Sequence, residues 1–178
     1  MRQIDLSAIG TNVGSSGLLA LSSVISTGQL THLTRVTLRD TTFKKNQLEV
    51  LLRALLEGCQ TLEELDLSGT SLCLSSGARY CLDALRLVCS IIVRPGGRLR
   101  NLGLRGTHLC ALPPGCDTGT GDKYSLDGIE MLCESLVSRD CVLQVRSGVY
   151  FRRRRCSCVC TLTEVASVCR NSTCQTMA

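Results

Sequence analysis

The sequence predicts an α/β fold in which a short unit, a strand followed by a helix, repeats along the chain. Two observations carry this prediction: an eleven-residue motif that occurs three times, and leucines at helical spacing in the segments that follow it. A third observation sets the kind of core, since five aromatic residues and no Trp stand against thirty Leu among 178 residues. The interior is therefore expected to be aliphatic, and the chain has the length of one domain.

The motif has the form L-x-x-L-x-L-x-x-T-x-L and matches residues 33–43, 62–72 and 99–109. Apolar residues occupy positions 1, 4, 6 and 11, and Thr occupies position 9 in every copy. The alternation around positions 4 to 6 describes a short strand with one buried face. Three matches over five fixed positions indicate an internal repeat.

Two weaker copies flank these three. Ile4 and Leu6 supply positions 4 and 6 of an N-terminal copy, and Leu143 and Val145 supply the same positions of a C-terminal copy. The residues at position 4 are then spaced by 32, 29, 37 and 41 residues. The sequence therefore predicts about four to five repeats.

Helices are expected between the strands because two parallel strands need a crossover connection. Residues 47–56 carry five leucines at helical spacing, and Gly58 follows them as a candidate C-cap. Residues 78–88 and 126–137 have a similar pattern, and residues 17–25 have a weaker one. Each strand is thus expected to be followed by its own helix.

Two insertions and a divergent tail interrupt the pattern. The insertions cover residues 93–98 and 111–124, and they are either tolerated surface loops or loops that carry function. Beyond residue 146 the pattern fails, since Leu162 is the only Leu in the last 32 residues. We therefore predict a repeat domain at 1–146 and a Cys- and Arg-rich tail at 147–178, which is a degenerate cap, a disordered extension or an unrelated appended sequence.

The repeat resembles the ribonuclease-inhibitor subfamily of leucine-rich-repeat proteins, whose units are about 28 residues long. The resemblance covers residues 1–146 and departs from the subfamily at position 9, where Thr replaces the usual Asn or Cys. Thr can still form hydrogen bonds with backbone groups at the bend after the strand. The resemblance implies a curved solenoid with parallel strands on the concave face, helices outside, and a concave face that binds partners.

Charged residues at the solvent-facing positions beside the strands are the candidate binding residues. They are Arg35, Arg39, Glu63, Glu64, Asp66, Arg100, Arg105 and Arg146. Because neighbouring strands lie about 4.8 Å apart, Arg35 is expected to meet Glu64, and Glu63 to meet Arg100. Stacked repeats also predict a row at position 7, formed by Arg39, Ser68, Arg105 and Arg146. The alternative interpretation is that these charges only satisfy one another at the surface.

The sequence offers little for catalysis, cofactors or metals. Its two His, His32 and His108, have no acidic or Cys neighbour of the kind used in nucleophilic catalysis. The tail segment 156–160 places three Cys at C-x-C-x-C spacing, which is tighter than the paired spacing of zinc sites. Residues 115–125 depart from the phosphate-binding pattern G-x-x-x-x-G-K-[ST]. We therefore expect no enzyme activity, no cofactor, no metal and no small-molecule substrate.

Charge and cysteine usage bear on partners and compartment. Residues 1–140 carry equal numbers of acidic and basic residues, whereas residues 141–178 carry six Arg and one Glu. The run from Arg152 to Arg155 is either a solvated tail or a nuclear-localisation or nucleic-acid-contacting element. The thirteen Cys are odd in number and lack paired spacing, so we interpret them as the reduced thiols of a cytoplasmic or nuclear protein. No apolar run is long enough to cross a membrane.

Three functional hypotheses follow. The first is an interaction module that binds a protein partner through the concave strand face. The second starts from the resemblance, since some repeat proteins of this subfamily activate the small GTPase Ran, and a GTPase-stimulation assay separates the two. The third is a fragment or decayed copy of a larger repeat protein with no activity of its own.

Overall fold

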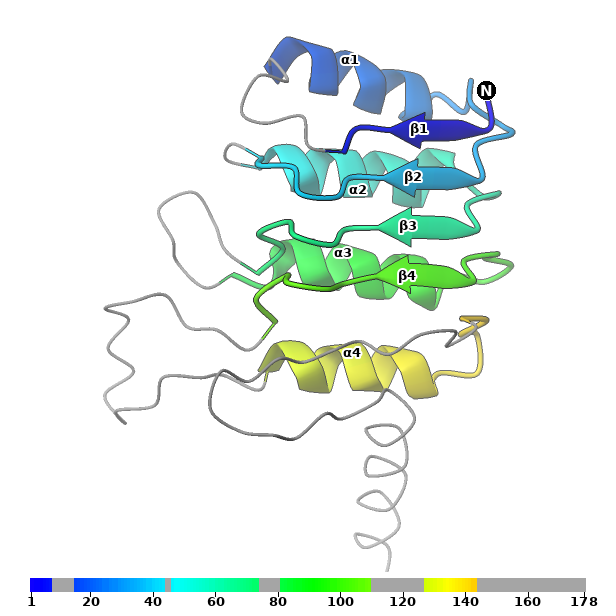
Figure 1. Ribbon diagram of the computed structural model, residues 1–178. Coiled ribbons are helices and arrows are strands. Elements are labelled where there is room, and N and C mark those ends of the chain that lie inside the picture. Colours follow the sequence, from blue (N-terminus) through cyan, green and yellow to red (C-terminus); the bar gives the residue numbers. More distant parts are fainter. Residues whose placement is uncertain (8–14, 44–45, 74–80, 110–126, 144–178) are drawn as a thin grey trace, which may run out of the picture.

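The computed structural model describes residues 1–7, 15–43, 46–73, 81–109 and 127–143. Strands and helices alternate along this part of the chain (Figure 1). The strands are β1 (Gln3–Asp5), β2 (Arg35–Thr37), β3 (Glu64–Asp66) and β4 (Asn101–Gly103). The helices are α1 (Ser15–Ser26), α2 (Gln47–Gly58), α3 (Asp83–Ile92) and α4 (Asp127–Val137). The strands form one parallel sheet in the order β1-β2-β3-β4, which confirms an α/β fold with helical crossovers.

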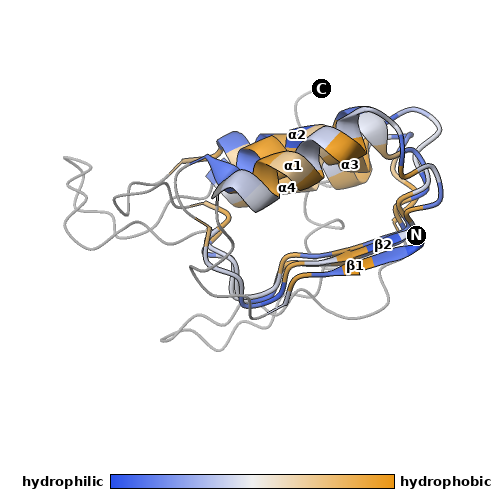
Figure 2. Ribbon diagram, turned by 90° about the horizontal axis from the view of Figure 1, so that it is seen from above, coloured by the Kyte–Doolittle hydropathy of each residue, from blue (hydrophilic) through white to orange (hydrophobic). Residues whose placement is uncertain are grey.

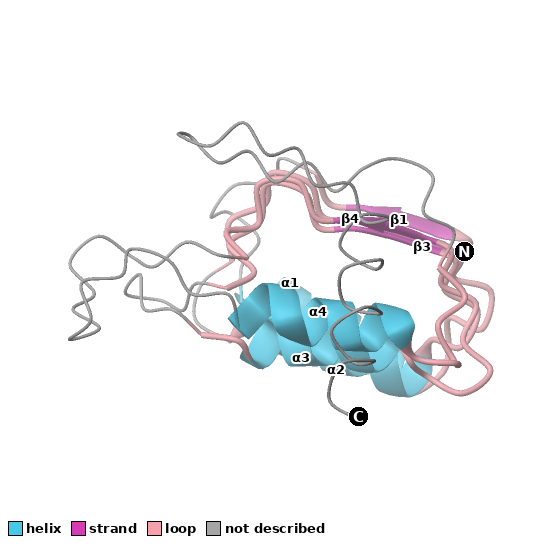
Figure 3. Cartoon of the chain, turned by 90° about the horizontal axis from the view of Figure 1, so that it is seen from below, coloured by secondary structure: helices cyan, strands magenta, loops and turns pink. Residues whose placement is uncertain are grey.

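The sheet and the helices form two layers (Figure 2). The four helices lie side by side over one face of the sheet, in the same order as the strands. The opposite face carries no described helix (Figure 3). The strand register follows the sequence motif, because the position 4 residues align across the sheet. These residues are Ile4, Val36, Leu65 and Leu102.

The repeated leucines fill the space between the layers. Leu38, Leu65 and Leu67, at positions 4 and 6, are fully buried, and Leu33 at position 1 is buried with them. The helices add apolar residues at helical spacing, and in α2 these are Leu48, Leu51, Leu52, Ala54 and Leu55. Burying one such side chain stabilises the fold by roughly 1.5–3 kcal/mol.

The Thr at position 9 has the structural role that the sequence predicts. Thr41, Thr70 and Thr107 are buried at the bend that follows each strand. The hydroxyls of Thr70 and Thr107 donate to the carbonyls of Leu67 and Leu104 at 2.7 and 2.8 Å. Each polar side chain is thus satisfied inside an apolar core, as a buried hydroxyl requires.

A left-handed residue at position 8 turns the chain after the strand in three units. Asp40, Gly69 and Gly106 have φ values of 53°, 74° and 71°. Asp and Gly are among the residues that tolerate this region. The backbone ladder continues through the bend, since the N–H of Asp40 donates to the Ser68 carbonyl at 2.8 Å and the N–H of Gly69 to the Arg105 carbonyl at 2.7 Å. Consecutive units therefore stay in register beyond the strands themselves.

Three expectations about local structure need correction. The third helix begins at Asp83 and ends at Ile92, later at both ends than the predicted 78–88. Gly58 is the last residue of α2 and has no positive φ, so it is not the left-handed cap; the C-cap is Cys59. The motif also implies that Leu102, the position 4 residue of the third copy, is fully buried like Leu65, but it is only partly buried. It lies on β4, which has a strand neighbour on one side among the described residues.

Gly58 is a glycine because α1 comes too close for a side chain. A Cβ at this position would overlap the Ile25 carbonyl oxygen and lie 2.8 Å from the Cα of Ser26. The ends of α1 and α2 therefore meet backbone to backbone. Arg94, in the first insertion, connects the end of α3 to the end of α2. Its guanidinium donates to the carbonyl of Cys59, the C-cap of α2, at 2.7 Å.

Several predictions lie outside the described residues. They concern the second insertion at 111–124, Arg146, the tail at 147–178 and the strand of the C-terminal copy. Leu143 is described, and it packs partly buried against the core. None of the described helices has the length and apolar character needed to cross a membrane.

Candidate interaction surface

Five of the eight candidate binding residues belong to the sheet face opposite the helices, which we call the open sheet face; they are Arg35, Arg39, Glu64, Asp66 and Arg105. Glu63 and Arg100 stand at position 2, directly before β3 and β4. The open sheet face consists of the side chains at positions 3, 5 and 7, which alternate with the buried residues. In the described units these are Gln3, Asp5 and Ser7; Arg35, Thr37 and Arg39; Glu64, Asp66 and Ser68; and Asn101, Gly103 and Arg105. The rigid parallel sheet fixes the backbone beneath them.

Two ion pairs connect β2 to β3 across this face. Arg35 Nε lies 2.7 Å from Glu64 Oε2, which confirms the pairing expected from the repeat. Arg39 Nη2 lies 3.1 Å from Asp66 Oδ2, a pair that the sequence did not predict. The Arg39 side chain is 59% exposed and Asp66 only 17%, so water screens this pair from one side. Partly exposed pairs of this kind orient side chains more than they add stability.

Asp66 is held by the backbone as well as by Arg39. Its Oδ1 accepts the N–H of Ser68 at 2.9 Å, and Asp5 accepts the N–H of Ser7 in the same way at 2.9 Å. Hydrogen bonds from the Ser7 hydroxyl and backbone N–H hold the pKa of Asp5 below its usual value, with a smaller contribution from the charge of Arg39. The ionised form of Asp5 is therefore favoured, because it is the form that accepts these bonds.

Gly103 on β4 leaves room for the Asp66 side chain of the neighbouring strand. A Cβ at position 103 would overlap Asp66 Oδ1 and lie 2.8 Å from its Cγ and 3.0 Å from Ser68 Oγ. The Asp66 side chain thus leans over the backbone of β4 and occupies the space that a larger residue would need. Only glycine allows this approach.

The expected pair between Glu63 and Arg100 is absent from the described residues. Their backbones meet, because the Arg100 N–H donates to the Glu63 carbonyl at 2.8 Å, but no ion pair joins the side chains. Both side chains are exposed, and an exposed pair gains little over hydration. Sequence position alone therefore predicted one of the two cross-strand pairs.

The row at position 7 is confirmed for three of its four members. Backbone hydrogen bonds between positions 8 and 7 place Arg39, Ser68 and Arg105 on consecutive units. Arg105 is exposed and forms no ion pair with a described residue. Arg146, the fourth member, lies outside the described residues.

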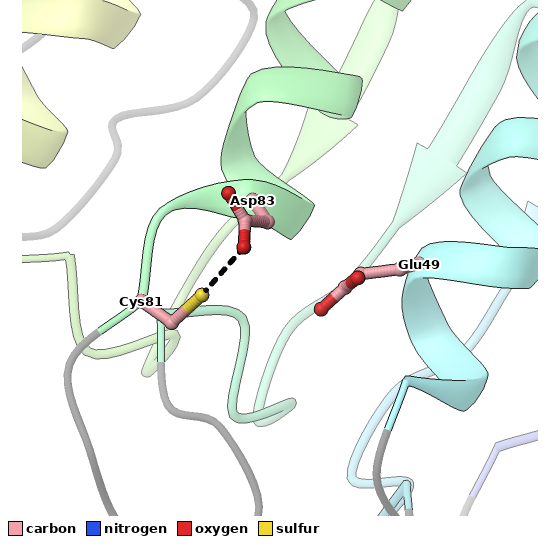
Figure 4. Close-up of side chains that lie close together, drawn as sticks. All are labelled: Glu49, Cys81 and Asp83. Carbon is pink, nitrogen blue, oxygen red and sulfur yellow. Dashed lines mark hydrogen bonds between the residues drawn. The ribbon is translucent and has the colours of Figure 1, made fainter.

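A separate cluster of potential metal ligands lies at the start of α2 and α3 (Figure 4). Glu49, Cys81 and Asp83 place their ligand atoms within 4.8 Å of one another. Cys81 Sγ donates to Asp83 Oδ2 at 3.1 Å, and Arg86 lies 3.4 Å from Asp83 Oδ1. Three donors are one fewer than a structural zinc site uses. The sequence did not reveal this cluster, because Glu49 is far from the other two along the chain.

The Cys81 thiol is a hydrogen-bond donor in this cluster. The backbone N–H of Asp83 favours the thiolate, but burial together with the Asp83 carboxylate outweighs it, and the pKa of Cys81 is raised. Glu49 adds a further negative charge nearby. The thiol therefore stays protonated at neutral pH, unlike the activated thiolate of a catalytic cysteine.

None of the described cysteines forms a disulfide, and most are buried. They are Cys59, Cys73, Cys81, Cys89, Cys133 and Cys141. Cys59 Sγ lies 3.2 Å from the Leu33 carbonyl, and burial is the main cause that raises the pKa of Cys59 and Cys89. These residues pack as small apolar groups, in agreement with their place in the repeat.

The open sheet face can act chemically as a set of charged hydrogen-bonding groups on a rigid support. Its arginines are donors suited to carboxylates, and its Asp and Glu are acceptors. No model of a known protein family matches the chain, and a search of curated proteins finds no significant match.

Proposed function

We propose that the protein is a leucine-rich-repeat interaction module, a curved solenoid that binds a protein partner on the open sheet face, which would be its concave side. The main support is the register of the units, because position 4 aligns from β1 to β4 and positions 3, 5 and 7 therefore form continuous rows. Rows of side chains on a stacked sheet provide an extended surface of the kind that repeat proteins use for binding.

Pre-ordered side chains also support a binding role. Arg35, Arg39 and Asp66 are each held by a partner on a neighbouring strand or in the backbone. Because these side chains are already ordered, less of their conformational entropy is lost when a partner binds. The free thiols favour a reducing compartment, and we propose the cytoplasm.

Hydrogen–deuterium exchange tests the location of binding. A partner recovered by affinity capture is identified, purified and added back to the full chain. Amide exchange is expected to slow in β2, β3 and β4 and in the bends that follow them, because a bound partner shields these strands. Protection confined to α1–α4 would place the partner on the helical layer and refute the proposal.

A pair of double variants tests the role of the charges. Arg39→Glu with Arg105→Glu reverses two charges on the open sheet face and is expected to abolish binding of the purified partner. Arg53→Glu with Arg86→Glu makes the same change in net charge on the exposed helical layer and should leave binding intact. Equal loss in both double variants would show a general charge effect.

A further inference from the structure

We propose that two copies of this chain associate through the end of the stack formed by β1 and α1, with β1 of one copy antiparallel to β1 of the other. We call this surface the β1 end. It consists of Met1, the strand β1 with Leu6, and the flank of α1 that carries Leu21 and Val24. The inference goes beyond the proposed function, because it requires no partner protein on the open sheet face.

The outer edge of β1 carries backbone groups without a partner. The strand order places β1 at one end of the sheet, with β2 as its only neighbour among the described strands (Figure 1). The carbonyl of Arg2 accepts an N–H of β2 at 3.1 Å, and the N–H of Leu6 donates to a carbonyl of β2 at 2.8 Å. Since successive residues of a strand point their backbone groups to opposite sides, those of Gln3 and Asp5 point away from β2. Such an edge is a template for another strand.

Apolar residues of the β1 end are less buried than their counterparts in the next unit. Met1, at position 1 of the motif, is 73% exposed, whereas Leu33 is fully buried. Leu6, at position 6, is only partly buried, whereas Leu38 is fully buried. The β2 unit lies between two neighbouring units, and the β1 unit has a described neighbour on one side only. Covering this apolar surface would therefore be favourable.

The flank of α1 that faces away from α2 adds further apolar surface. Ile25 is buried in the core, and Ser26 is the residue whose Cα comes close to Gly58 of α2. Because each residue turns a helix by about 100°, Val24 lies on the flank opposite Ser26, and Leu21 lies beside Val24. Val24 is 37% exposed. Moreover, α1 is the one described helix without a charged residue, although the ends of repeat stacks usually carry polar outer faces.

The β1 end is complementary to a second copy of itself. Around a two-fold axis, antiparallel edges can exchange backbone hydrogen bonds, because each residue brings one donor and one acceptor. Arg2 stands directly before β1 and Asp5 is its last residue, and both are exposed. An antiparallel pair therefore places opposite charges near each other at both of its ends, whereas a parallel pair would place like charges together. The uncharged α1 meets its own copy without repulsion.

Sedimentation velocity of the full chain in reducing buffer tests the association. A monomer–dimer equilibrium that depends on concentration is expected, with no larger species. Amide hydrogen exchange, compared between conditions that favour the monomer and the dimer, locates the interface. Exchange is expected to slow on dimerisation in residues 1–7 and in α1, and to stay unchanged in α3 and α4.

A matched pair of variants tests the helical part of the interface. Val24→Glu places two carboxylates close together across the two-fold axis and should weaken the dimer at least about tenfold. Val50→Glu makes the same change at a residue of similar exposure, 39%, on α2, and should change the dissociation constant less than about twofold. Circular dichroism of both variants confirms that they are folded.

A second pair tests the strand. Gln3→Pro removes the outward N–H and leaves the bonds of Arg2 and Leu6 to β2 in place, since Pro is tolerated at the first residue of a strand. The dimer should weaken in Gln3→Pro and persist in Gln3→Ala, which keeps the N–H.

Several outcomes would overturn the inference. They are a monomer at every concentration up to the solubility limit, assemblies larger than a dimer, equal weakening in Val24→Glu and Val50→Glu, a dimer unaffected by Gln3→Pro, and protection from exchange outside β1 and α1. All of these measurements use the chain alone. Their failure is therefore distinct from a failure of the open sheet face to bind a partner.

Discussion

Replacement of Gly58 with Ala should destabilise the protein, although the same replacement at an open helical site stabilises it. In a helix Ala is favoured over Gly by up to about 1 kcal/mol. At Gly58 the added methyl group would overlap the Ile25 carbonyl oxygen and lie 2.6 Å from its carbonyl carbon. These are backbone atoms, and the Ile25 carbonyl also accepts the N–H of Gly28 at 3.0 Å. The collision therefore cannot be relieved by rotating a side chain.

The expected magnitude follows from two opposing effects. Overpacking in a well-packed region costs typically 1–3 kcal/mol, and contact with fixed backbone places this site near the upper end, at about 3 kcal/mol. Subtracting a helix-propensity gain of about 1 kcal/mol leaves a loss of about 2 kcal/mol in the free energy of unfolding. For a chain of this size the corresponding fall in melting temperature is about 4–8 °C.

Gly17→Ala provides the matched control. Gly17 lies in α1, and a Cβ there would meet nothing within 4 Å. This variant should gain up to about 1 kcal/mol and raise the melting temperature by about 2–4 °C. Thermal unfolding followed by circular dichroism measures both shifts. A melting temperature that rises in Gly58→Ala, or that moves in the same direction in both variants, would refute the close approach of α1 and α2.

Two other predictions concern the core and its thiols. Leu65→Ala should lower the free energy of unfolding by roughly 2–5 kcal/mol, because Leu65 is fully buried. Leu102→Ala should lower it by clearly less, because Leu102 is only partly buried. Denaturant titration measures both losses, and equal values would contradict the prediction. Burial raises the pKa of Cys59 above its usual value of 9.0, so its contribution to stability is fully present below about pH 9 and is lost as the pH rises through the higher folded value. Stability measured against pH should therefore fall less steeply above pH 9 in Cys59→Ala than in the unchanged protein, and parallel curves would show that Cys59 does not contribute.

The repeat motif was sufficient to predict the strands, their register and much of the core. Positions 4 and 6 alternate with polar neighbours over a few consecutive residues, so each copy specifies a strand with one buried side without reference to the rest of the chain. Equal motifs in successive copies then predict that Val36 aligns with Leu65, which the sheet confirms. The hydrogen bond of the Thr at position 9 was predictable for the same reason. The hydroxyls of Thr70 and Thr107 donate to carbonyls within their own units, so the bond does not depend on the rest of the chain.

Contacts between units were less predictable. The sequence anticipated Arg35 with Glu64, but not Arg39 with Asp66, and it wrongly paired Glu63 with Arg100. Long charged side chains reach several neighbours, and hydration competes with each pairing, so strand order alone does not select the partner. The left-handed bend at Asp40 had a signal that was missed, since Gly occupies the same position in the next two copies.

The sequence by itself determined the α/β unit, the parallel order of the strands and the leucines that pack between the layers, because these depend on patterns within one unit or repeated between units. Only the tertiary structure decided why Gly58 must be small, where Gly103 lies beneath the Asp66 carboxylate, and that Glu49 approaches Cys81 and Asp83. Each of these depends on the distance between two different units. The packing of helices and strands in three dimensions sets that distance, and no local pattern encodes it.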